Sequence, residues 1–134
     1  MKKLLIAIST VLLLLGCSSK QQTGLREALV EKFKDDQDLK DYKLDPEEIA
    51  DCMLKEITAN VPGFPGDPRR DKFFEAYARF VGVRSPSDAE KAITDYQELF
   101  GSAKKARAAA NTITDHLMTC MGKAIEGGGG PLSQ

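Results

Sequence analysis

The chain has 134 residues, with 19 basic and 20 acidic side chains and a net charge of −1 at neutral pH. This near balance argues against nucleic acid as a partner, because proteins that bind nucleic acid usually present a strongly basic face. The length is sufficient for one domain with its own hydrophobic core.

A short basic segment and an apolar run open the chain. Lys2 and Lys3 precede an uncharged stretch, 4–15, that is mostly Leu, Ile, Val and Ala. This stretch has the length and flanks of a signal-peptide hydrophobic region. It is too short to cross a bilayer core of about 30 Å, which needs roughly 20 apolar residues. The sequence therefore predicts a signal peptide over 1–16.

The apolar run ends at Leu14-Leu15-Gly16-Cys17. These residues resemble the lipobox of bacterial lipoproteins, in which a dedicated peptidase cuts before the cysteine and acyl chains are attached to it. Leu15 is bulkier than the Ala or Ser usual at its position. The resemblance implies that Cys17 carries lipid such as palmitate, with no resemblance beyond this residue. The alternatives are an ordinary secretory signal with a chance cysteine, or an uncleaved anchor.

Lipid on Cys17 implies a membrane as partner without a membrane-spanning helix. Two or more acyl chains give stable anchoring, at about 0.8 kcal/mol per buried CH₂. Ser18, rather than Asp, follows the cysteine. In lipoproteins of the Gram-negative type this choice favours the outer membrane, so the resemblance implies an anchored protein that faces the periplasm. In a host with a single membrane this implication lapses.

The chain has three cysteines, an odd number for an exported protein. With Cys17 given to lipid by the resemblance, Cys52 and Cys120 remain as a pair. The periplasm is oxidising, which favours a disulfide over two free thiols or a metal site. In the chain-entropy model, closing a loop of about 68 residues stabilises a fold by roughly 4 kcal/mol.

The chain after the signal peptide is expected to be helical. Residues 17–24 are predicted to be the lipidated cysteine and a flexible polar tether, and 25–126 a helical domain. The first helix is expected to begin at Leu25, where apolar residues recur with a spacing of four. The acidic stretch 35–45 is expected to be a solvated loop. It resembles a calcium loop only partly, because Asp41 stands where an EF-hand requires Gly.

Three further helix starts are marked by a capping residue before Pro, at Asp45-Pro46, Asp67-Pro68 and Ser85-Pro86. Behind the second start, apolar residues with helical spacing form one stripe, which is more often core than a ligand pocket. The stripe consists of Phe73, Phe74, Tyr77, Phe80 and Val81.

Gly101-Ser102 either separates two helices or lies inside one bent helix. Beyond it, apolar residues recur in alternating steps of three and four, which predicts a helix packed nearly parallel to its neighbours. These residues are Ala103, Ala106, Ala110, Ile113, Leu117, Cys120 and Ala124. Residues 127–134 are expected to be a disordered tail. The predicted fold class is all-α, a bundle of four or five helices stapled by one disulfide.

Glu56 and His116 are a candidate polar pair, each one helical turn from a cysteine of the predicted disulfide. They are expected to be adjacent if their two helices run antiparallel, whereas a parallel arrangement places His116 near Glu48. A pair that braces the disulfide is the favoured interpretation. A metal or pH-sensitive site is the alternative, but the chain has no second His, so no metal is expected.

Phe64, between Pro and Gly in a loop, is the best candidate for a partner contact. Lys104, Lys105 and Arg107 form a small basic cluster that is expected to be a solvated face. No nucleophile motif or phosphate-binding loop occurs, so we expect neither an enzyme nor a cofactor.

The favoured hypothesis is a non-enzymatic binding or assembly module with an envelope protein partner. The alternative is a small carrier or sensor of an apolar ligand, held between the aromatic helix and the last helix. A hydrolase with an unrecognised site ranks last.

Overall fold

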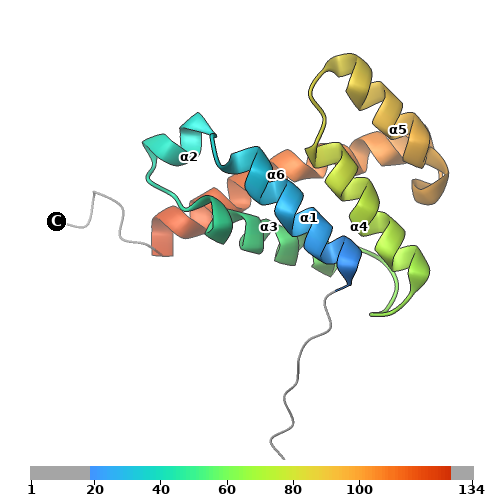
Figure 1. The fold of residues 1–134 in the computed structure, drawn as a ribbon, viewed down its shortest axis with the longest axis horizontal. Coiled ribbons are helices and arrows are strands. Elements are labelled where there is room, and N and C mark those ends of the chain that lie inside the picture. Colours follow the sequence, from blue (N-terminus) through green and yellow to red (C-terminus); the bar gives the residue numbers. More distant parts are fainter. Residues whose placement is uncertain (1–18, 128–134) are drawn as a thin grey trace, which may run out of the picture.

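The computed structural model describes residues 19–127, which form six helices and no strand (Figure 1). The predicted all-α fold is therefore confirmed, with six helices where four or five were expected. The predicted signal peptide, Cys17 and the tail beyond Gly127 lie outside the described residues. The helices are α1 (Lys20–Phe33), α2 (Gln37–Asp41), α3 (Pro46–Asn60), α4 (Pro68–Val81), α5 (Pro86–Phe100) and α6 (Ala103–Gly127).

Helices α1 and α3 run antiparallel. The side-chain amide of Gln22, near the start of α1, donates to the Thr58 hydroxyl near the end of α3 at 3.4 Å. One turn further along α1, Arg26 Nε donates to Asp51 Oδ1 at 2.5 Å. Helix α1 also packs on α4, and the long helix α6 packs on both α3 and α5 (Figure 1).

The predicted capping residues begin the helices as expected. The side chains of Asp45, Asp67 and Ser85 accept a backbone N–H two or three residues later, at 2.8, 2.8 and 3.1 Å. Gly101 ends α5 with a φ of 93°, a conformation that glycine adopts without steric cost. The Ser102 hydroxyl then accepts the backbone N–H of Lys105, in the first turn of α6, at 3.1 Å. The chain therefore breaks at Gly101 and does not continue as one bent helix.

The first helix begins five residues earlier than predicted. Ser19 caps it by accepting the backbone N–H of Gln22 at 3.1 Å, and α1 starts at Lys20. Residues 20–24 are therefore helical and not a tether. Their polar composition concealed the helix, because only from Leu25 onward does its face reach the core.

A short helix also interrupts the predicted acidic loop. Asp36 caps α2 by accepting the backbone N–H of Leu39 at 3.1 Å. The Leu39 side chain is 1% exposed and attaches the segment to the core. A single apolar residue has no periodicity, so the sequence pattern did not predict this turn.

The core is formed by apolar faces of all six helices, and no polar or charged residue in the described range is buried. Every member of the aromatic stripe in α4 is buried. The predicted seam of α6 also faces the core, because each of its seven members is buried or packs against buried residues.

Candidate functional site

The connection between α3 and α4, residues 61–67, exposes an apolar tip. The backbone N–H of Asp67 donates to the Phe64 carbonyl at 3.1 Å, and Gly66 has a φ of 93°. With Pro65 second and Gly66 third, these four residues form a type II turn. The Phe64 side chain at its first position is 70% exposed. The structure thus places the predicted contact residue at the surface.

Arg70, in the first turn of α4, fixes this connection from inside. Its guanidinium donates to the backbone carbonyls of Val61 and Gly63 at 2.6 and 3.0 Å, and to that of Thr58 at 3.1 Å. The same group lies 5.5 Å from the centre of the Phe74 ring. Because one planar guanidinium group donates to three carbonyls, the connection has a defined conformation.

Gly63 is required by the same geometry. Its φ is 92°, and a Cβ atom at this position would lie 2.8 Å from Asp67 Oδ2. The Asp67 carboxylate is needed there because it caps α4. The glycine therefore allows the loop backbone to approach the helix start closely.

An open groove of about 400 Å³ lies beside the connection, between α4 and the junction of α5 with α6. Phe73, Tyr77 and Phe100 provide aromatic lining, and Arg69 and Lys105 are the cations that border it. Neither cation forms an ion pair with another described residue. The groove is open to solvent, whereas Phe74 is 2% exposed and lies in the core.

The sulfur atoms of Cys52 and Cys120 lie 2.03 Å apart, at disulfide distance, and link α3 to α6. Glu56 forms its ion pair with Lys123 of α6. The hydrogen bond from Lys123 and its charge lower the pKa of Glu56, and the charge of His116 adds a smaller effect. The hydrogen-bonding partner of the Glu56 carboxylate is therefore Lys123, and not His116 as in the predicted pair.

The three residues of the predicted basic cluster, Lys104, Lys105 and Arg107, have different surroundings in the structure. Arg107 donates to both carboxylate oxygens of Glu90 at 2.8 and 2.6 Å. Lys104 is exposed, and Lys105 borders the groove. Within residues 19–127 no cluster of three metal-ligating side chains occurs, and no helix is both long and apolar enough to cross a membrane.

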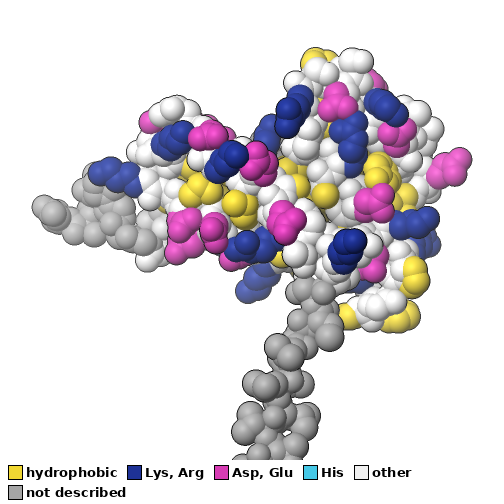
Figure 2. Space-filling view, in the orientation of Figure 1, with side chains coloured by type: hydrophobic (Ala, Val, Ile, Leu, Met, Phe, Trp, Pro, Cys, Tyr) yellow, Lys and Arg dark blue, Asp and Glu magenta, His cyan; other side chains and the backbone are white. Residues whose placement is uncertain are grey.

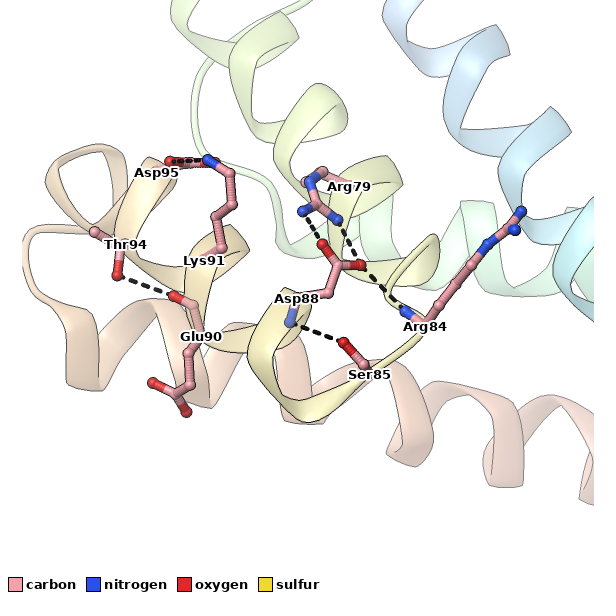
Figure 3. A network of polar contacts seen from close by, with 8 residues as sticks. All are labelled: Arg79, Arg84, Ser85, Asp88, Glu90, Lys91, Thr94 and Asp95. Atoms are coloured by element: carbon pink, nitrogen blue, oxygen red, sulfur yellow. Dashed lines mark hydrogen bonds and ion pairs between the residues drawn. The ribbon is translucent and has the colours of Figure 1, made fainter.

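A polar network at the α4–α5 joint was not expected from the sequence (Figure 3). The Asp88 carboxylate accepts two bonds from the Arg79 guanidinium and a third from the backbone N–H of Arg84. These bonds hold the pKa of Asp88 below its usual value, with the Arg79 bond as the largest cause. The only sequence signal was Asp88 three residues after the Ser85 cap. The network joins two helices and leaves no free group for chemistry.

The comparisons give no assignment of the chain to a family. No known protein family matches it, and no solved structure matches it. Over 84 residues it is 31% identical to an aspartyl/glutamyl-tRNA(Asn/Gln) amidotransferase subunit of Rhizobium meliloti (strain 1021). The match covers 63% of this chain and 17% of the relative, so the chain spans about a sixth of the length of that protein.

Proposed function

We propose that this chain is a lipoprotein of the bacterial envelope, fixed to a membrane by lipid on Cys17, whose helical domain binds a protein partner without catalysing a reaction. We place it at the outer membrane, facing the periplasm. The observation that carries the proposal is the position of Cys17. It ends the lipobox-like segment and stands two residues before Ser19, which caps the first helix.

Two further features support an exported, anchored domain. All six helices within residues 19–127 follow Cys17, so cleavage before this residue leaves them intact. The sulfur atoms of Cys52 and Cys120 lie at disulfide distance, and such bonds persist in oxidising compartments such as the periplasm.

Metabolic labelling with palmitate tests the anchor. The native chain is expected to take up label and to fractionate with membranes, whereas Cys17→Ser is expected to do neither. Equal labelling of the two forms, or release of the native form from membranes, would contradict the proposal. Cys52→Ala/Cys120→Ala is the matched control, because it removes the other two cysteines and should keep the label.

Cross-linking in intact cells tests the partner. A protein that is recovered with the native chain should be lost when an unrelated helical domain follows residues 1–19. Recovery with both chains would show only that the two proteins share a membrane, and would contradict a binding role for the domain.

The groove beside α4 supports the second candidate, a carrier of an apolar ligand. Its aromatic lining fits an acyl chain, and Arg69 and Lys105 fit an acidic head group. A fluorescent fatty acid should then bind the native chain and bind Arg69→Glu/Lys105→Glu less tightly. Equal affinity for both forms, or no binding, would exclude this candidate.

The similarity to the amidotransferase subunit does not support a role with tRNA. The named protein acts in a system that includes tRNA, whereas this chain has a net charge of −1. RNA binding usually depends on a basic surface. We therefore do not extend the activity of that protein to this chain.

A further inference from the structure

The apolar tip of the α3–α4 connection cannot fold back onto the domain. Phe64 is 70% exposed, and its neighbours Pro62 and Pro65 are also exposed. Arg70 holds the preceding backbone by three hydrogen bonds, and the type II turn fixes the backbone that follows. Figure 2 shows hydrophobic side chains gathered at this edge of the molecule. A fixed apolar tip stays in water unless an external surface covers it.

This tip lies at the end of the bundle where α1 begins (Figure 1). The bond from Gln22 to Thr58 joins the first turn of α1 to the last turn of α3, and the connection follows three residues later. Cys17 precedes Lys20 by three residues. Three residues span at most about 10 Å. Lipid on Cys17 would therefore hold this end of the bundle close to the head groups of a bilayer.

The charged residues are distributed unevenly between the two ends of the domain. Residues 34–51, at the opposite end of α1 and α3, carry eight acidic and three basic side chains. Residues 55–72, around the tip, carry three acidic and four basic side chains, and Lys20 adds another base. Bacterial membranes contain anionic lipids, which attract basic side chains near the surface and repel acidic ones. This asymmetry favours the tip end as the one that faces the membrane.

We propose that Phe64, with Pro62 and Pro65, inserts into the interfacial layer of the membrane that holds the lipid anchor. The domain then rests on the bilayer through the end at which α1 begins, and α2 faces away from it. Exposed apolar side chains on an end of the domain with a slight excess of basic residues suit an interfacial contact, in which apolar groups enter the boundary of the acyl chains. This inference rests on the proposed anchor at Cys17.

The absence of Trp from the chain permits a direct test. Phe64→Trp places one indole at the tip, and Tyr42→Trp places one at the opposite end, next to α2. Tyr42 is a matched control because it is aromatic and 60% exposed, against 70% for Phe64. Each full-length lipidated variant is purified from membranes and inserted into vesicles of phosphatidylethanolamine and phosphatidylglycerol, with or without bromine on the acyl chains.

The expected result is a blue shift of the Phe64→Trp emission on insertion into vesicles, and its quenching by brominated lipid. The emission of Tyr42→Trp should neither shift nor be quenched. Equal quenching of both variants would overturn the orientation. Vesicle-bound protein without quenching of Phe64→Trp would overturn the insertion, and protection of this Trp only in native envelopes would point to a protein partner at the tip.

The two proposals fail in distinguishable ways. If Cys17 carries no lipid, the protein does not remain with the vesicles after flotation, whichever Trp it carries. If the anchor is present but the tip does not insert, the protein floats with the vesicles and the Phe64→Trp emission stays at its value in water. Phe64→Ser is expected to keep the native helix content by circular dichroism, because the native ring is largely exposed.

Discussion

At the scale of single residues, the α3–α4 connection depends on one side chain that its sequence does not reveal. Phe64 could be predicted as exposed, because Pro and Gly on both sides exclude a helix and indicate a loop tip. Arg70 could not be predicted as its support. Its partners are backbone carbonyls, which every residue has, so no residue pattern marks them.

Arg70→Met should destabilise the domain by about 2 kcal/mol, because it removes hydrogen bonds from a charged donor and leaves half-buried carbonyls without a partner. Urea unfolding followed by circular dichroism measures the change. Arg69→Met is the control, since the neighbouring guanidinium forms no hydrogen bond with a described side chain. Equal losses for the two variants would show that the connection does not depend on the bonds of Arg70.

At the scale of helices, the sequence predicted best what is decided within a few residues. Asp45, Asp67 and Ser85 each cap a helix because the cap and the N–H that it accepts lie within three residues. The start of α1 and the whole of α2 were missed. Both have local caps, Ser19 and Asp36, but the residues that follow these caps show no apolar periodicity. Leu39 is held by core contacts that arise only in the folded bundle.

Ser85→Ala should lower the free energy of unfolding by about 1 kcal/mol, the usual cost of losing an N-cap. The Ser85 hydroxyl accepts the Asp88 N–H, and alanine leaves this donor to water. Ser87→Ala is the matched control, because Ser87 is exposed in the same turn. Thermal unfolding of the two variants checks the prediction. It is wrong if Ser87→Ala lowers the free energy of unfolding as much as Ser85→Ala does.

Because of Asp88, the free energy of unfolding of the domain should decrease at acid pH. The pKa of Asp88 is lowered in the folded state by Arg79 and Arg84, so its contribution is fully present above the ordinary value of 3.8 and is lost as the pH falls through the folded pKa. Asp88→Asn should therefore be less stable than the native chain at neutral pH, and the difference should shrink below pH 3.8. Urea unfolding over a pH series measures it.

The control for acid dependence is Asp95→Asn. Asp95 forms an exposed ion pair with Lys91 one turn away in α5, and pairs of this kind contribute little. This variant should follow the native stability at every pH. If the difference in free energy of unfolding between the native chain and Asp88→Asn stays constant down to acid pH, the charge of the Asp88 carboxylate does not stabilise the α4–α5 joint.

At the scale of the whole molecule, the cysteines gave the one long-range restraint that the sequence contained. Once Cys17 is set aside, Cys52 and Cys120 are the only other cysteines, and the pairing of α3 with α6 follows. The remaining arrangement was not accessible from periodicity, which tells which face of a helix is buried but not against which partner. The ion pair between Glu56 of α3 and Lys123 of α6 is such a case, because it depends on how these two helices lie against each other.

The disulfide should therefore account for a large part of the stability of the domain. Its cysteines are 68 residues apart, and closing a loop of this size restricts the unfolded chain by about 4 kcal/mol in the entropy model. Cys52→Ala/Cys120→Ala should lose about this much, measured by urea unfolding without reductant, and the native chain with reductant should approach the same value. Cys17→Ser should unfold like the native chain, because residue 17 precedes the first helix. Equal stability of the oxidised native chain and the double variant would mean that packing between α3 and α6 holds the bundle without the covalent link.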